Sequence, residues 1–372
     1  MILLKRCVAF VTRNVVLCVA VAAAIVTSFF VPPDAAYLSY FDWKTLSCLF
    51  CVLAVVCALK NIRFFYHLAH GIVRRFRTMR SCVLALVTVT FVGSMLLAND
   101  MALLTFLPLG FFVLETTGKR QYMAFTFIMQ NIAANLGGML TPFGNHQNLY
   151  LYSYFDIPDL TFLSVMVWPF VLAVSLIAVC CVVFVKAEPL DIPEDATEID
   201  RPRLIVYLVL FALSIAIVFR GIPYWIGLIV IPVVLWFTDR RALMMVDYPL
   251  LFTFMAFFIF AGNLSRLPVV HTLLGGLMAE NPLLVSTLSC QCISNVPTAV
   301  LLSRFTTAYP SLLIGVNIGG TGTLIASLAS LITYREYSKH NKQGRGKYLL
   351  LFSAFNFGFL IVLYAFAVLL GY

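Results

Sequence analysis

Charged residues are scarce in this chain. Asp, Glu, Lys and Arg make up only 11% of its 372 residues, whereas 62% are hydrophobic. Soluble domains carry about 25% charged residues, so this composition excludes a soluble globular protein. Apolar runs of the roughly 20 residues that a membrane span needs recur along the whole sequence, more than one signal peptide could explain. We therefore expect an all-α polytopic protein in a lipid bilayer.

Enzymatic motifs are missing as well. The sequence has no phosphate-binding loop, no zinc-protease helix signature and no nucleophile with a matching base, which argues against an enzyme and against ATP-driven transport by this chain. No cofactor is expected apart from a coupling ion, Na⁺ or H⁺. Disulfides are not expected either, since most of the ten cysteines lie singly in apolar runs such as "LSCLFCVLAVVCAL" and behave as small buried hydrophobes. The "SCQC" sequence at 289–292 leaves a soft-metal or thiophilic site open.

The basic residues lie in short loops between the apolar runs. The formal net charge is +9, but this distribution follows the positive-inside rule and does not indicate a nucleic-acid partner. When loops are assigned to alternate sides, all but four of the 25 Lys and Arg share the side of the N-terminus; the exceptions are Lys44, Arg220, Arg266 and Arg304. We therefore expect a multi-pass inner (plasma) membrane protein with a cytoplasmic N-terminus and an external C-terminus. The first run ends in "FFVPPD" instead of a small-residue cleavage site, so we expect it to be retained.

Polar residues interrupt several of the apolar stretches. Residues 81–115 and 272–305 each have a polar midpoint, "LLANDMALL" and "CISNVPTAV", which is typical of re-entrant hairpins. Residues 121–153 and 311–333 are predicted to be interrupted spans, and residues 61–80 mix apolar and basic residues as an interfacial helix does. Full spans are predicted near 13–32, 45–60, 161–185, 203–219, 221–237, 248–265 and 348–370.

The same features recur in the same order in the two halves. The hairpin tip "LLANDMALL" corresponds to "CISNVPTAVLL", and "ANLGGMLTPFG" corresponds to "VNIGGTGTLIA". These alignments match Asn99 with Asn295, Asn135 with Asn317, and Gly137 and Gly138 with Gly319 and Gly320. Inverted repeats with broken helices are typical of secondary transporters, which bind substrate at the repeat interface. We predict a first repeat at 1–187, a cytoplasmic acidic linker at 188–202, an inverting helix at 203–219 and a second repeat at 220–372.

The interrupted regions supply groups that a small polar solute needs. A broken helix exposes N–H groups that favour anions and carbonyls that favour cations, and glycine permits the break. Neutral amides and hydroxyls nearby suit an oxyanion or a hard cation. They are Asn99, Asn135, Asn145, Asn148, Ser294, Asn295, Asn317, Thr141, Thr321 and Thr323. Interhelical hydrogen bonding and small-residue packing are the alternative role for the same residues.

Asp100 is the acid that lies deepest in a predicted hairpin, between "SMLLAN" and "MALLTFLP". A buried carboxylate either pairs with a cation or carries a proton, and both suit ion coupling; helix capping is the alternative. Its counterpart in the second half is Val296, so its role belongs to one half only. His146, in "GNHQN", leaves substrate contact open, but we expect it near the external mouth.

At "NDMALLTFLP", "NLGGMLTPFGNHQNLYLY" and "SNVPTAVLL" the chain resembles the ion-transporter superfamily, in particular its citrate-type and arsenite-type permeases. The resemblance covers most of both halves. It implies an elevator-type secondary carrier, often a homodimer, in which hairpin tips and unwound helix centres enclose substrate and coupling ion. At the matching positions it implies these site residues: Asn99, Asp100, Asn135, Gly137, Gly138, Thr141, Pro142, Gly144, Asn148, Ser294, Asn295, Pro297, Asn317, Gly319 and Gly320.

The chain departs from the dicarboxylate branch, which carries Ser-Asn-Thr at both tips. Here the tips read Ala98-Asn99-Asp100 and Ser294-Asn295-Val296, which argues against two equivalent sodium sites. We therefore expect a secondary active transporter of a small anionic substrate, a carboxylate or an inorganic anion, coupled to H⁺ or Na⁺. Arsenite or antimonite efflux is the first alternative and Na⁺/H⁺ antiport the second. A channel or a non-transporting membrane scaffold would share the composition.

Overall fold

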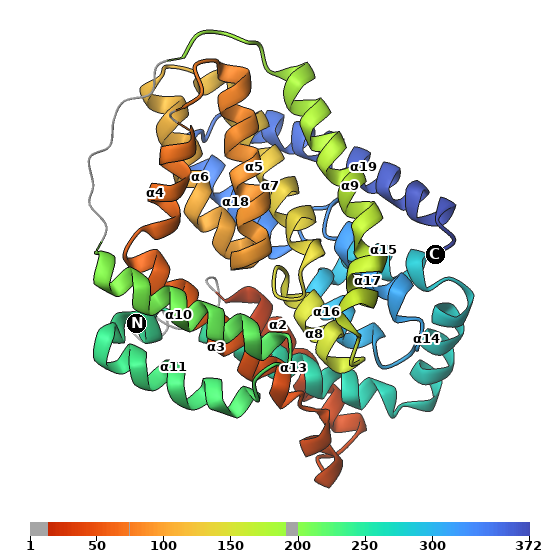
Figure 1. The fold of residues 1–372 in the computed structure, drawn as a ribbon. Helices are drawn as coiled ribbons and strands as arrows, with labels where there is room; N and C mark the ends of the chain where they lie inside the picture. The colour runs from red at the N-terminus through yellow and green to blue at the C-terminus, as the bar shows by residue number, and fades with distance from the viewer. Residues whose placement is uncertain (1–13, 74, 191–199) are drawn as a thin grey trace, which may run out of the picture.

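The computed structural model describes residues 14–73, 75–190 and 200–372, and in these ranges the ordered elements are helices, apart from one isolated β-bridge between Thr78 and Pro189. The all-α prediction is confirmed. The N-terminal half, red to yellow-green in Figure 1, comprises α2 (Val15–Phe30), η1 (Ala35–Tyr40), α3 (Trp43–Asn61), α4 (Phe64–Val73), α5 (Met79–Leu97), α6 (Asn99–Thr116), η2 (Arg120–Tyr122), α7 (Met123–Gly137), η3 (Gly138–Leu140), α8 (His146–Tyr154) and α9 (Asp159–Phe184).

The C-terminal half, green to blue in Figure 1, contains a similar succession of helices. They are α10 (Arg201–Val218), α11 (Tyr224–Thr238), α12 (Arg240–Met244), α13 (Tyr248–Ser265), α14 (Pro268–Glu280), α15 (Pro282–Ile293), α16 (Asn295–Leu302), α17 (Tyr309–Ile318), α18 (Leu328–His340) and α19 (Arg345–Leu369). Within the described ranges, six helices are long and apolar enough to cross a membrane: α3, α5, α9, α10, α13 and α19. The chain is therefore a multi-pass membrane protein.

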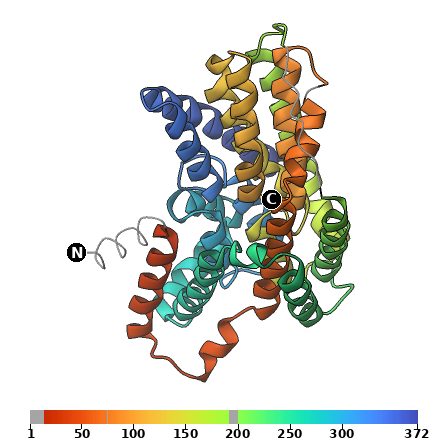
Figure 2. The same cartoon turned by 90° about the vertical axis from the view of Figure 1, so that its left-hand side faces the viewer.

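Helix α3 is the most enclosed of these spans. In its apolar window 72% of residues are buried, compared with 22% in α9. Helices α10 and α11 pack against α3, whereas α2 packs against α13. Apolar side chains such as Phe184 on α9 and Ile205 on α10 are exposed, as expected where the outer face of a helix meets lipid. In both Figure 1 and Figure 2, η1 lies at the lower edge and the α5–α6 pair in the upper part.

Two helix pairs are joined by single-residue turns. Ala98 connects α5 to α6 and Ser294 connects α15 to α16. Both residues have nearly the same backbone angles, φ 69° and ψ 146° at Ala98 and φ 73° and ψ 157° at Ser294. A positive φ is unfavourable for residues other than glycine, so the same strained turn occurs twice. Residues 272–280, predicted to belong to the second hairpin, lie instead in α14. Asn281 separates α14 from α15, and its Oδ1 caps α15 by accepting the N–H of Leu284 at 2.8 Å.

Two further helices are interrupted. Helix α7 ends at Gly137, and regular α-helix resumes only at His146 in α8. Helix α17 ends at Ile318, and α18 begins at Leu328. Residues 138–145 are called here the first unwound segment, and residues 319–327 the second unwound segment.

Loops that the charge pattern assigns to the cytoplasm contact one another. Lys119 pairs with Glu188 just after α9, and the Asn61 amide donates to Asp239 at 2.8 Å. The Lys119 ammonium holds the pKa of the Glu188 carboxyl below its usual range. Residues 191–199, most of the predicted acidic linker, lie outside the described part of the chain.

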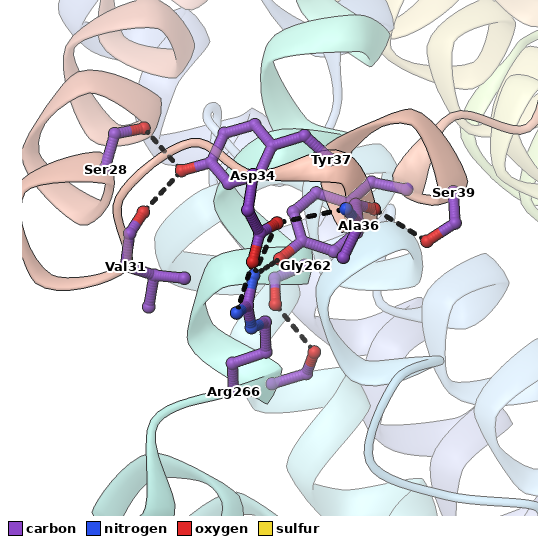
Figure 3. A network of polar contacts seen from close by, with 10 residues as sticks. Ser28, Val31, Asp34, Ala36, Tyr37, Ser39, Gly262 and Arg266 are labelled. Carbon is purple, nitrogen blue, oxygen red and sulfur yellow. Dashed lines mark hydrogen bonds and ion pairs between the residues drawn. The ribbon is translucent and has the colours of Figure 1, made fainter.

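Loops assigned to the external side also contact one another. Arg220 lies 3.2 Å from Asp156, and Arg266, after α13, forms an ion pair with Asp34 at 2.7 Å (Figure 3). Asp34 belongs to the first half and Arg266 to the second, so this pair joins the halves. The Arg266 guanidinium lowers the pKa of the Asp34 carboxyl.

Candidate functional site

The first unwound segment is held by an asparagine of the helix that follows it. Asn148 Nδ2 lies 3.2 Å from the carbonyl oxygens of Gly138 and Met139 and 3.3 Å from that of Thr141. Thr141 Oγ1 in turn donates to the carbonyl of Met95 on α5 at 2.7 Å. A buried carbonyl without a donor costs about 1–3 kcal/mol, so Asn148 replaces donors that the broken helix has lost.

The second unwound segment is held from a different element. Gln291, on α15, donates Nε2 to the carbonyls of Gly319 at 2.8 Å and Thr321 at 3.1 Å, and its Oε1 accepts the N–H of Thr323 at 2.9 Å. Gly322 has φ +115°, and a Cβ at that position would lie 2.2 Å from Gln291 Oε1. Sequence analysis did not single out Gln291, because a glutamine between two cysteines matches no motif.

Amide side chains connect the two halves. Asn99, at the first hairpin tip, donates Nδ2 to Asn135 Oδ1 at 3.0 Å. Asn145 Nδ2 lies 3.0 Å from the Asn135 carbonyl and 3.1 Å from Asn317 Oδ1. Asn317 Nδ2 donates to Asn148 Oδ1 at 2.6 Å. We call these five buried residues the amide network; it runs from the first hairpin through the first unwound segment to α17.

The second hairpin tip reaches the same place near Gly320. A Cβ added to Gly320 would lie 3.0 Å from Asn295 Nδ2 and 3.8 Å from Asn135 Oδ1. The backbone N–H of Asn295 donates to the carbonyl of Ala326 in the second unwound segment at 2.9 Å. The second tip and the second unwound segment thus meet beside Asn135, the residue that Asn99 of the first tip also contacts.

The paired glycines allow close approach and do not adopt unusual backbone angles. Gly138 and Gly319 have φ −61° and −63°, ordinary helical values. A Cβ on Gly137 would lie 2.4 Å from a backbone oxygen of α5, and one on Gly319 would lie 2.9 Å from Cys290 Sγ. The prediction that conformational freedom of these glycines permits the breaks is therefore wrong; in the second segment the residue with that freedom is Gly322.

The remaining predicted residues surround the network. Pro142 and Gly144 are buried in the first unwound segment, and Pro297 is buried in the first turn of α16. Ser294 is half-buried at the second turn, with Oγ 3.3 Å from the Ala326 carbonyl. Thr321 Oγ1 donates to the carbonyl of Ile318, three residues before it, at 2.6 Å. These five residues shape the site and, among the residues that the structure describes, make no hydrogen bond that links them to the amide network.

Asp100 and His146 face each other beside the network. Their side chains are 6% and 5% exposed, and His146 Nε2 lies 3.9 Å from Asp100 Oδ1. His146 was expected near the external mouth; that expectation is wrong, because His146 opens α8 inside the molecule, with its ring 6.5 Å from that of Phe254. The contact joins two elements far apart in sequence, so spacing could not reveal it.

The site holds one carboxylate and no strong cation. Across the ranges that the structure describes, no Lys or Arg side chain is buried, and no cluster of three His, Cys, Asp or Glu could hold a metal. The first turns of α6, α8 and α16, which begin at Asn99, His146 and Asn295, supply partial positive charge instead. Several buried polar atoms have no hydrogen-bond partner in the described part of the chain, among them Asn135 Nδ2 and Asn145 Oδ1. Such atoms are costly at membrane depth unless a solute or water meets them.

Comparison with known proteins agrees with this architecture. The family described as "Citrate transporter" (CitMHS) matches residues 1–310. The uncharacterized transporter MJ0456 of Methanocaldococcus jannaschii is 29% identical over 88% of this chain and 89% of its own length. The inner membrane protein YbiR of Escherichia coli K12 is 31% identical over 83% of this chain and 84% of its own. The silicon efflux transporter LSI3 of Oryza sativa subsp. japonica is 34% identical over 32% of this chain and 24% of its own. The chain belongs to the citrate transporter family and is a membrane-spanning secondary transporter, not an enzyme.

Proposed function

We propose that the chain transports a small anion or oxyanion, coupled to H⁺ or Na⁺, and that the substrate binds at the amide network. The observation that carries this proposal is the network itself, buried and shared by the two halves, with polar atoms such as Asn135 Nδ2 and Asn145 Oδ1 left without partners. A purely structural network is expected to satisfy its own members.

We further propose that the halves are inverted repeats that work by an elevator mechanism. Matched contacts support the repeats: Thr141 donates to the Met95 carbonyl at 2.7 Å, and Thr323 donates to the Gln291 carbonyl at 3.1 Å. Each threonine lies at the same offset from its paired asparagine, and each carbonyl at the same offset from its tip asparagine. The reciprocal packing of α2 on α13 and α11 on α3 fits the same relation. The homodimer rests on family resemblance.

The proposed orientation has a cytoplasmic N-terminus, an external C-terminus and an inner-membrane location. The loop contacts support it, because Lys119 with Glu188 and Asn61 with Asp239 each join loops assigned to the cytoplasm. YbiR, a relative over most of the chain, is named as an inner membrane protein.

The electrostatics of the site favour a substrate of low charge. A multiply charged anion beside Asp100, with no buried Lys or Arg among the described residues, would lack the compensation that buried charge requires. An uncharged or singly charged oxyacid needs only amide groups and helix N-termini. This observation favours the second candidate, efflux of a metalloid oxyacid such as arsenite or antimonite, and the partial similarity to a silicon efflux transporter supports it.

Na⁺/H⁺ antiport with Asp100 as the titrating group is the third candidate.

Ligand-induced stabilisation tests the proposal. The purified protein is heated with citrate, phosphate, sulfate, arsenite, silicic acid or Na⁺, because a ligand that binds the native state raises its apparent stability, by about 2.7 kcal/mol at 100 times Kd. We expect one small oxyacid or anion to stabilise the parent and to lose its effect in Asn317→Ala. Asn61→Ala is the matched control, since Asn61 contacts Asp239 away from the network.

Transport in proteoliposomes then separates the functional classes. The stabilising ligand should accumulate against its gradient when a pH or Na⁺ gradient is imposed. Flux that runs only downhill would identify a channel. No stabilisation by any ligand, together with a lowered stability of Asn317→Ala, would favour a scaffold.

A further inference from the structure

The contact between Asp100 and His146 is not explained by packing alone. Both side chains are more than nine-tenths buried, and within the described residues Asp100 Oδ1 and His146 Nε2 lack hydrogen-bond partners while lying 3.9 Å apart. Asp100 is not the cap of α6: Ala98 holds that position, and Asp100 follows in the first turn. Hydrogen bonding in the described structure therefore does not account for the burial of these two atoms.

The two side chains belong to elements with different attachments. Asp100 is at the tip of the first hairpin, and His146 opens α8 at the end of the first unwound segment. Each stands in the first turn of its helix, so a movement of the hairpin tip relative to α8 would change the distance between the two side chains.

Other titratable groups stand on the elements around the pair. Cys57 of α3 interacts electrostatically with Asp100, and α3 also carries Lys44, Cys48, Cys51 and Lys60. Of the other elements packed against α6 and α8, helices α7 and α16 carry no titratable residue. The rest carry Arg80 and Cys82 on α5, Tyr66 and His67 on α4, Arg120 and Tyr122 on η2, Tyr309 on α17, and Tyr334 to His340 on α18.

We propose that Asp100 and His146 together form one proton-binding unit, which binds a proton when the first hairpin tip and α8 approach and releases it when they separate. A charge-assisted hydrogen bond between the two groups needs a separation of about 2.8 Å, so an approach of about 1 Å is enough to form it. His146 takes the proton from the aqueous side that is open at that moment and returns it to the other side; no other bond is made or broken. Since the two groups flank the amide network, substrate occupancy and proton occupancy are linked. This inference rests on the proposed transport function and assigns its coupling ion.

Histidine NMR tests the pair without a substrate. The chain has five histidines, and the His146 signal in protein labelled at histidine Cε1 is assigned by its loss in His146→Gln. We expect the titration midpoint of that signal to move to lower pH by about one unit or more in Asp100→Asn, because an opposite charge at this range shifts a midpoint by 1–3 units. His271→Gln, an exposed site on α14, should leave the His146 signal unchanged. An identical His146 titration in the parent and in Asp100→Asn would overturn the pairing.

Transport separates failure of this inference from failure of the proposed function. With arsenite and citrate as probes, parent proteoliposomes are compared with Asp100→Asn and His146→Gln in uphill uptake driven by a pH gradient and in exchange of labelled for unlabelled probe. We expect the ratio of uphill uptake to exchange to fall at least tenfold in both variants. Retention of uphill uptake by both variants overturns the proton-binding unit while leaving the transporter intact. If the parent shows neither uphill uptake nor exchange, but the His146 titration still moves as expected in Asp100→Asn, the proposed substrates are wrong and the Asp100–His146 pairing stands.

Discussion

The two unwound segments begin alike and are stabilised differently. Each begins within an Asn-x-Gly-Gly sequence, and in each a threonine donates to a carbonyl of the adjacent hairpin arm. The first segment is held by Asn148 of α8, the helix that continues it, whereas the second is held by Gln291 of α15, an arm of the hairpin. The first segment is almost wholly buried, whereas Ile325 in the second is 50% exposed.

This difference lies in the element that carries the stabilising amide group. In the first half Asn148 belongs to α8, and Thr141 also ties the segment to the hairpin arm α5. In the second half Gln291 belongs to α15, and Thr323 ties the segment to the same hairpin arm. The carboxylate at the first tip, Asp100, has Val296 as its counterpart. The backbone pattern is shared but the carboxylate is not, so the proton-binding unit that we propose belongs to the first half alone.

The largest effect is expected at Gly322, which has no counterpart of positive φ in the first segment. Gly322→Ala should destabilise the protein by roughly 2–5 kcal/mol, since it adds a left-handed alanine and a clash with Gln291 Oε1. In a Gln291→Ala background the clash is gone, and the added cost should fall to about 1–2 kcal/mol. Unfolding in mixed SDS micelles measures both values. Gly358→Ala, where a Cβ meets no atom within 4 Å, is the control and should not destabilise; additive effects of the two changes would contradict the contact.

A smaller effect is expected from removing the two amides themselves. Asn148→Ala should cost roughly 1–3 kcal/mol of unfolding free energy, because fully buried carbonyls lose their donor. Gln291→Ala should cost about 1 kcal/mol, since Gln291 is half-buried and water can replace it. The same denaturation measurement ranks them. If Gln291→Ala were the more damaging, the second segment would be the better enclosed one, contrary to the burial seen here.

The coarse features of this molecule could be predicted from sequence, and the specific contacts could not. Hydrophobic composition gave the all-α multi-pass fold, and motifs such as "NDMALLTFLP" indicated the family. The repeats and the roles of the site residues stay predictions. Gln291 could not be anticipated, because its role depends on the position of α15 beside Gly319. The glycine pairs stand out in the sequence, but their role is close packing against neighbouring elements and not backbone flexibility. A local sequence pattern does not distinguish these two roles.

The smallest expected effect concerns the contact that the two segments share. Thr141→Val and Thr323→Val each remove one hydrogen bond to a hairpin arm while keeping the side-chain shape. The Thr141 bond is the shorter, 2.7 Å against 3.1 Å, so Thr141→Val should cost about 1 kcal/mol and Thr323→Val about half of that. Thr105→Val, which loses only a bond to a carbonyl within its own helix, is the matched control for a threonine that links no elements. If both segment variants matched this control, the threonine contacts would not link the segments to the hairpins. The shared geometry would then be a consequence of the backbone fold alone, and the segments would be attached by the two amides and by contacts such as that of the Asn295 N–H with the Ala326 carbonyl.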